Sequence, residues 1–194
     1  MILEVVKYGQ PVLRQKGARI EKLTPEIKQL IADMFDTMHE RHGVGLAAQQ
    51  IGKALQLTVI DVREATDRPS TLELDGKPAE VNVIMPLVLI NPEIKPSGES
   101  VKAGEGCLSF PEIFGEIPRP EFVDVKALDK NFKPIEFRAG GLLSRAVQHE
   151  VDHLNGILFI DRMDKKTKQE LQDLLDTLQA ETKAGLEKKK PSKR

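Results

Sequence analysis

The stretch Gln148-His149-Glu150-Val151-Asp152-His153-Leu154-Asn155-Gly156 carries the strongest structural and chemical signal in this sequence. We predict a helix from about Leu142 to Asn155, because glycines flank that run on both sides and the following glycine is a favourable C-terminal stop. Residues four apart lie on one face of a helix. His149 and His153 therefore project together, with Cβ atoms about 5–6 Å apart, close enough to bind one metal ion.

The helical wheel places these histidines on the apolar side of the predicted helix. They share that side with Leu142 and Ala146, whereas the polar residues of the run gather opposite, namely Arg145, Gln148 and Asp152. An imidazole that faces an apolar interior needs a polar partner, and a metal ion supplies one. Glu150 lies about 100° round the helix from His149. Its carboxylate can therefore reach a ligand of the metal without binding the metal itself.

Two histidines at this spacing also arise by chance, so a metal site requires a third ligand. The metzincin class is excluded, because its third histidine would stand where Phe159 does. Glu170 and Asp173 further on flank a leucine stripe, which is typical of a solvated helix side. The remaining candidate is Cys107, the only cysteine in the chain, in the stretch Glu105-Gly106-Cys107-Leu108-Ser109.

A lone cysteine is by default a small buried apolar side chain. Beside two inward-facing histidines, however, a thiolate completes a three-ligand set that leaves a fourth position open for water. The sequence therefore favours a metal site at Cys107, His149 and His153. The alternative, a buried cysteine with no ligand role, stays open at this point.

A glycine-rich stretch, Gly43-Val44-Gly45-Leu46-Ala47-Ala48-Gln49-Gln50, stands earlier in the chain. It is not a dinucleotide-binding fingerprint, because no strand precedes it and the third glycine is missing. Two interpretations remain. The glycines can supply the positive φ of an ordinary helix-to-strand turn. They can instead form a bare backbone edge that meets a substrate closely, with a glutamine amide as hydrogen-bond donor.

The remaining pattern predicts two more helices and several short strands. One helix begins at Thr24-Pro25-Glu26, where threonine is a good N-cap and proline suits the first helical position, and apolar residues follow at helical spacing. Another follows Asp164 to about Ala184, where Gly185 should loosen it; its leucines on one face are 171, 174, 175 and 178. Strands are predicted at 57–62, 87–90, 123–128 and 135–138.

Strands thus precede and separate the helices without strict alternation, so we predict an α+β fold. In it, small antiparallel or mixed β-sheets surround a central helix that carries the His-Glu-x-x-His motif, and a C-terminal helix follows. The polar segment from Arg63 to Asn82 is expected to be a loop or a loose hairpin. A chain of 194 residues suits one domain. We assign residues 1–185 to it, C-terminal helix included, and residues 186–194 to an unfolded basic tail.

Composition excludes several classes of protein. No apolar run approaches the roughly 18–20 residues that cross a bilayer, so we expect no membrane span. The first residues lack the pattern of a secretory signal, and a single cysteine allows no intrachain disulfide, which favours a reducing cytoplasm. The net charge of −1 is uneven, because residues 183–194 carry +5 and the remainder −6. An acidic body argues against nucleic-acid binding by the whole surface, whereas the basic tail can bind locally.

Taken in order, the glycine stretch, the Glu-Gly-Cys-Leu-Ser stretch and the His-Glu-Val-Asp-His stretch resemble the three signature motifs of peptide deformylases. The resemblance extends from Tyr8-Gly-Gln-Pro-Val-Leu-Arg14 to Gly156, which is most of the chain. The leucine-rich helix after Asp164 is similar to the C-terminal helix of the type I bacterial members. The resemblance implies an enzyme that hydrolyses the N-formyl group from the initiator methionine of new polypeptides and releases formate.

The resemblance also implies roles for individual residues. Three side chains would bind a divalent metal ion: Cys107, His149 and His153. Glu150 would act as the general base. The oxyanion of the formyl group would be stabilised by the metal, the Gln50 side-chain amide and the main-chain N–H of Leu108.

Substrate contacts are expected beside this centre. Gly45 would hydrogen-bond the peptide backbone, which requires close approach without a side chain, and Val44 would lie next to it. Arg119 has two interpretations, a contact with the substrate or an ion pair with acidic residues near the site.

Ligand chemistry and family resemblance point to different metals. One thiolate and two imidazoles in a tetrahedral arrangement suit zinc. The resemblance implies Fe2+, which zinc, nickel or cobalt can replace. We expect Fe2+ in the cell, with one ion per chain.

The resemblance implies N-formylmethionyl nascent peptides as partners, in the cytoplasm of a bacterium. Because those substrates emerge from the ribosome, we expect the C-terminal helix and residues 186–194 to dock near the exit tunnel. Neither a membrane nor DNA is expected as a partner. Two other interpretations remain. One is a zinc peptidase of the general His-Glu-x-x-His kind that cuts internal bonds. The other is a metal-stabilised module that binds ribosomes or RNA through its tail and needs no base at Glu150.

Overall fold

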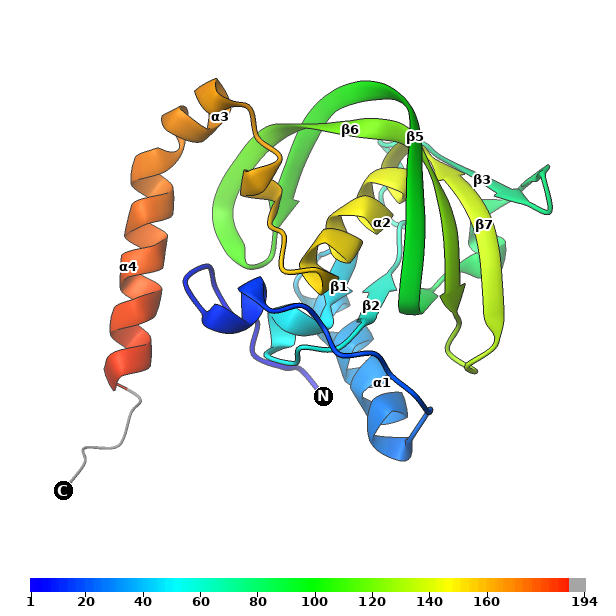
Figure 1. Ribbon diagram of the computed structural model, residues 1–194, viewed down its shortest axis with the longest axis horizontal. Coiled ribbons are helices and arrows are strands. Elements are labelled where there is room, and N and C mark those ends of the chain that lie inside the picture. The colour runs from blue at the N-terminus through cyan, green and yellow to red at the C-terminus, as the bar shows by residue number, and fades with distance from the viewer. Residues whose placement is uncertain (189–194) are drawn as a thin grey trace.

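The computed structural model describes residues 1–188, in which one sheet of seven antiparallel strands surrounds a central helix (Figure 1). The strands pair in the order β1-β2-β5-β6-β7-β3-β4. Their bounds are β1 Gly45–Ala47, β2 Leu57–Ile60, β3 Ser70–Leu74, β4 Lys77–Ala79, β5 Leu87–Cys107, β6 Phe110–Leu128 and β7 Pro134–Gly140. The helices are α1 Pro25–Glu40, α2 Gly141–Leu154, α3 Lys165–Glu170 and α4 Gln172–Lys188. The α+β prediction is confirmed, with the strands joined into one sheet.

The longest elements are β5 and β6, which form a hairpin with strands of 21 and 19 residues. They pair as far as Cys107 opposite Phe110, and Figure 1 shows the hairpin curving over one end of α2. The sequence predicted only a short piece of each strand, at 87–90 and 123–128. The stretch 93–100 resembles a loop in sequence, because most of its side chains are exposed and it contains a proline and a glycine.

The helix α2 lies inside the molecule along its length, since every residue from Leu142 to Leu154 is buried. Its predicted bounds were right to within one residue. The predicted polar side does not face solvent, however: Arg145, Gln148 and Asp152 are 7%, 4% and 7% exposed. The β5–β6 hairpin covers that side, where carbonyl groups of the hairpin accept hydrogen bonds from Arg145 and Gln148.

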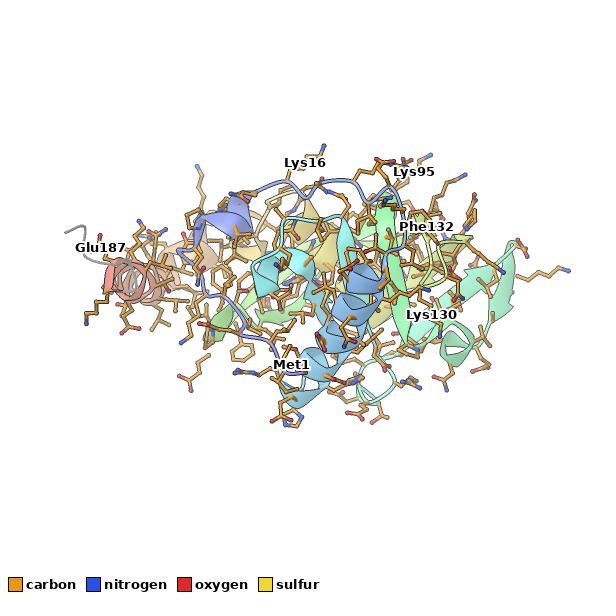
Figure 2. The ribbon with its side chains drawn as sticks, turned by 90° about the horizontal axis from the view of Figure 1, so that it is seen from below. Met1, Lys16, Lys95, Lys130, Phe132 and Glu187 are labelled. Carbon is orange, nitrogen blue, oxygen red and sulfur yellow. The ribbon has the colours of Figure 1, made fainter. Side chains whose placement is uncertain are left out.

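The helix α1 begins as its sequence predicts. Thr24 caps it by accepting a hydrogen bond from the Ile27 N–H at 3.3 Å, and Pro25 is the first helical residue. Its buried side packs with residues of β1 and β2 through Ile31, Met34 and Met38. Figure 2 shows Met1 beside this helix, where the terminal ammonium pairs with Asp33 at 2.7 Å.

The predicted loop or loose hairpin between Arg63 and Asn82 contains the hairpin β3–β4. The chain turns at Asp75 and Gly76, both of which have positive φ, and β3 also pairs with β7. The segment before β3 covers the start of α2, where the Pro69 carbonyl accepts a hydrogen bond from the Leu142 N–H at 3.0 Å. This segment therefore lies at one end of the central helix.

The predicted C-terminal helix is divided in two. Asp164 caps α3 by accepting a hydrogen bond from the Thr167 N–H at 2.8 Å, and the chain bends at Leu171 before α4 begins. Within the predicted leucine face of α4, Leu175 is buried at 2% exposure, whereas Leu174 is 53% exposed. Burial of a single leucine leaves most of α4 on the surface.

The predicted end of the helix near Gly185 is wrong, because α4 runs through Gly185 to Lys188. Residues 186–188 are thus helical where an unfolded tail was expected, and residues 189–194 lie outside the described part of the chain. Figures 1 and 2 show α4 at the side of the molecule farthest from β3 and β4, with Glu187 near its outer end. Within residues 1–188, no helix is both long and apolar enough to cross a membrane.

Candidate metal centre

The three predicted metal ligands meet at the turn of the β5–β6 hairpin. Cys107 ends β5, His149 and His153 lie one turn apart on α2, and one donor atom of each lies within 4.8 Å of the others. The Sγ atom of Cys107 is 3.3 Å from His153 Nε2. A tetrahedral ion with bonds of about 2.3 Å to sulfur and 2.0–2.1 Å to nitrogen needs donors roughly 3.3–3.6 Å apart. This donor set therefore fits a divalent metal ion.

Glu105 orients the first of the two histidines. Its Oε2 atom lies 2.9 Å from His149 Nδ1, which leaves Nε2 of that ring for a metal. Burial alone would raise the pKa of Glu105, but hydrogen bonds from His149 and Arg119 outweigh this effect and lower the pKa to about 2. Glu105 is therefore ionised at neutral pH and holds one tautomer of the ring.

Glu105 belongs to a network of buried ion pairs. Arg119 is 3% exposed and donates to the two Glu105 oxygens at 2.5 and 3.0 Å and to Asp152 at 2.9 Å. Asp152 also accepts two hydrogen bonds from Arg162, and Arg145 donates to Glu105 at 2.8 Å. Each buried charge thus faces an opposite one, as burial requires. This position fits the second interpretation of Arg119, an ion pair with acidic residues near the site.

Glu150 carries a carboxylate oxygen without a partner. Its Oε2 atom is buried and makes no hydrogen bond with any residue of the described chain. Burial raises the pKa of Glu150 to about 7, although the charges of His149 and Arg119 act to lower it. Gly45 makes room for this carboxylate, since a Cβ atom at Gly45 would lie 2.3 Å from Glu150 Oε1. A carboxylate with this pKa can both accept and return a proton at neutral pH.

The Gln50 amide is fixed beside the thiol. Its carbonyl oxygen accepts a hydrogen bond from the Ala47 N–H at 2.9 Å, so its Nε2 atom points the other way. That nitrogen lies 3.4 Å from Cys107 Sγ and 3.3 Å from Ser109 Oγ. Leu108 follows Cys107 directly, in the turn of the hairpin. The two predicted oxyanion donors therefore flank the same metal ligand.

A cavity of about 470 Å³ opens onto these groups. It is lined by most of the predicted site residues, which are Val44, Gly45, Gln50, Cys107, Leu108, His149 and Glu150, but not by His153 or Arg119. Among the strands of residues 1–188, β1 lies at one end of the sheet order and pairs only with β2, so its other edge can pair with an extended peptide. Of the two interpretations of the glycine stretch, the substrate-facing edge fits this position.

Two carboxylates of the site were missed by the sequence analysis. Glu105 was quoted only as a neighbour of Cys107, and Asp152 was assigned to the polar side of its helix. The available signal for Glu105 was its position two residues before Cys107, because residues two apart on a strand project to the same side. Using that signal required a strand that the sequence did not predict over these residues. No comparable signal marked Asp152, whose partner Arg119 is 33 residues away in sequence.

Comparison with known proteins shows what this site belongs to. The family model described as "Polypeptide deformylase" matches residues 2–169. The chain belongs to the polypeptide deformylase family. The peptide deformylase of Opitutus terrae is 47% identical over 187 residues, which cover 95% of this chain and 97% of that one. The peptide deformylase of Methylacidiphilum infernorum is 46% identical, with 92% and 93% covered.

Solved structures of peptide deformylases have the same fold. Arabidopsis thaliana peptide deformylase 1B in complex with an inhibitor is 35% identical, with a TM-score of 0.81 over 94% of this chain and 93% of that one. The Synechococcus elongatus enzyme in complex with actinonin is 40% identical, with a TM-score of 0.75 over 91% and 85%. Members of the family are metal-dependent hydrolases that remove the N-formyl group from nascent peptides. The predicted activity of this chain is confirmed on that basis.

Proposed function

We propose that the chain deformylates N-formylmethionyl peptides with Cys107, His149 and His153 as metal ligands and Glu150 as the general base. One observation carries this assignment: the partnerless Glu150 oxygen and the three-donor set lie together beside one cavity. A divalent ion held there supplies Lewis-acid activation of water and of the formyl oxygen. Glu150 accepts the proton of the attacking water and returns it to the departing amine.

The neighbouring donors stabilise the negative charge that develops on the formyl oxygen. We assign this role to the Gln50 amide and the Leu108 main-chain N–H. The hydrogen bond from the Ala47 N–H supports the assignment for Gln50, because it fixes which end of the amide faces the site. A donor that is already oriented needs no rearrangement when the charge forms.

The free edge of β1 would bind the peptide backbone. Gly45 hydrogen-bonds it, and Val44 contacts the side chains next to it. For Arg119 we propose a positioning role instead of substrate contact, because its buried guanidinium already pairs with Glu105 and Asp152. It would hold Glu105 in place on His149.

The activity is tested with formyl-Met-Ala-Ser and its acetyl analogue. Formate should be released from the formyl peptide only, since an acetyl group adds a methyl group at the reacting carbon. Casein serves as a second control, because a general zinc peptidase would cut its internal bonds. Equal cleavage of formyl and acetyl peptides, or cleavage of casein, would contradict the proposal.

For the metal we propose Fe2+ in the cell, although the thiolate and the two imidazoles also suit zinc. Anaerobic purification followed by metal analysis, with specific activity expressed per bound metal, tests this. Iron-loaded protein should be the most active form. Highest activity per metal with zinc would overturn the choice of iron.

We further propose that the enzyme works in the bacterial cytoplasm and docks on the ribosome near the exit tunnel through α4 and the basic residues that follow it. The exposed surface of α4 and the +5 charge of residues 183–194 support this, because contacts with phosphates release counterions and bind rRNA at low salt. Deleting 186–194 should weaken co-sedimentation with ribosomes and leave turnover of a free tripeptide unchanged. A tail of equal length with glutamine at each basic position is the matched control. Undiminished pelleting of both variants would contradict docking.

A further inference from the structure

Two arginines that take no part in the reaction described above line the catalytic cavity. Arg41 follows the last turn of α1, and Arg68 precedes β3 in the segment that covers the start of α2. Neither guanidinium makes an ion pair or a hydrogen bond with any residue between 1 and 188. Arg68 is also half-buried, and a partly buried cation without a counterion is costly. This is an arrangement suited to an anion that arrives with the substrate.

The other charged residues that line the cavity, apart from Glu112, have an ion-pair partner or a proposed catalytic role. Arg145 and Glu105 pair with each other at 2.8 Å, and Glu150 is the proposed base. Glu112 is the remaining acidic residue of the lining, and among the described residues it has no ion pair. Besides the proposed base Glu150, the charged residues of the lining without a partner among residues 1–188 are therefore Arg41, Arg68 and Glu112.

Arg68 lies at the end of the cavity away from the reacting centre. One wall of the cavity is the side of α2 that carries Leu142, Ala146 and His149, and seven residues of helix span about 10 Å. Arg68 is adjacent to Pro69, whose carbonyl is bonded to Leu142 at the far end of that wall. Arg41 also lines the cavity and stands four residues before Gly45, at the start of the edge proposed to bind the peptide backbone. A peptide whose formyl group lies at the metal ligands reaches these arginines with its later residues.

We infer that Arg41 and Arg68 form a subsite for a carboxylate in the second or third residue of the formylated peptide. The subsite selects among formyl-Met peptides, a choice that deformylation chemistry itself does not make. This inference rests on the cavity roles proposed above. Arg41 is exposed and Arg68 half-buried, so an ion pair with them contributes modestly and is weakened by salt. The selectivity is therefore moderate and largest at low ionic strength.

The test compares kcat/KM for isosteric pairs of C-terminally amidated peptides, so that no terminal carboxylate interferes. The pairs are formyl-Met-Asp-Ala with formyl-Met-Asn-Ala, and formyl-Met-Ala-Asp with formyl-Met-Ala-Asn. The protein as it stands should prefer the acidic member of at least one pair by about three- to tenfold at low salt. The preference should fall to about one in the double variant R41Q/R68Q, and E112Q should increase it.

Lys77→Gln is the matched control, since Lys77 is an exposed residue of β4 that does not line the cavity. This variant removes one positive charge outside the cavity and should keep the preference for acidic peptides. The inference is overturned if the unsubstituted protein does not distinguish the pairs, or if R41Q/R68Q keeps the preference. In either case turnover of the asparagine peptides still reports deformylation, so failure of the subsite is separate from failure of the proposed function.

Discussion

The helices α2 and α4 have 14 and 17 residues, and both mix leucine with charged side chains, yet they lie in opposite environments. Figure 1 shows α2 enclosed by the sheet and α4 at the outer side of the molecule. In α2 every residue from Leu142 to Leu154 is buried, whereas in α4 only Leu175 is. A charged side chain on α4 is satisfied by water. On α2 it must find a protein partner or remain costly.

The buried polar atoms of α2 that lack a hydrogen-bond partner are therefore informative. Arg145, Gln148 and Asp152 all have hydrogen-bond partners, but Glu150 Oε2 and His153 Nδ1 are buried with none among the described residues. Both belong to the proposed metal centre. In this helix the unsatisfied buried atoms therefore coincide with groups that are proposed to act in the chemistry of the site.

The largest expected effect comes from Glu150→Gln, which keeps the size of the side chain and removes the proton acceptor. We expect kcat to fall by a factor of about 10² to 10⁴, because general acid–base catalysis contributes in this range. Metal content and thermal stability should stay near those of the unsubstituted protein. Glu181→Gln on the exposed surface of α4 is the control and should change none of these quantities. Near-normal turnover by Glu150→Gln would show that another group is the base.

Truncating one leucine in each helix should show how differently α2 and α4 contribute to the free energy of unfolding. Leu143 is 0% exposed in α2, so Leu143→Ala should lower the free energy of unfolding by about 2–5 kcal/mol, the range for buried leucines. Leu174 is 53% exposed in α4, and Leu174→Ala should change it by less than about 0.5 kcal/mol. Urea denaturation measures both. Similar losses in the two variants would mean that α4 is covered in solution.

These two helices also show how much of the structure could be predicted from the sequence. Glycines on either side predicted the bounds of α2, and the histidine spacing together with one cysteine indicated the candidate metal centre. The same wheel argument that turned the histidines inward also turned Asp152 outward, and that part was wrong. Charged residues occur both in buried ion pairs and on the solvent-exposed side of a helix, so the sequence of the helix alone does not distinguish the two. The fold distinguishes them here, because it brings Arg119 to Asp152.

The strands were harder to predict for a related reason. The β5–β6 hairpin extends beyond the sheet core, and the middle residues of β5 face solvent, so they lack the alternation of apolar and polar residues that predicts a strand. Its course is set by pairing between two strands of the chain and not by local propensity. This hairpin supplies Glu105, which explains why the histidine's carboxylate partner was missed together with the strand that carries it.

The next largest effect is expected on metal affinity when Glu105 is substituted. In Glu105→Gln the amide can still reach His149, but Arg119 and Arg145 lose the charge that they share. We expect metal affinity to fall by about 10- to 100-fold, the usual cost of altering a group behind a metal ligand. Competition with a chelator measures it independently of turnover. Asp173→Asn in α4 is the control, and an unchanged affinity in Glu105→Gln would show that the histidine needs no carboxylate.

The smallest effect concerns Gly185, the glycine at which the sequence predicted that α4 would loosen. A Cβ atom there would meet no other atom within 4 Å, and the residue lies inside the helix. Gly185→Ala should therefore stabilise the end of α4 by about 0.5–1 kcal/mol through the lower backbone entropy of alanine. Because this end is exposed, hydrogen exchange of the amides near residue 185 should slow while the midpoint of global unfolding stays constant. The contrasting substitution is Gly45→Ala, which would place a methyl group against Glu150 and should lower turnover. Slower exchange throughout α2 in Gly185→Ala would contradict this contrast, because it would mean that the two helices unfold as one unit.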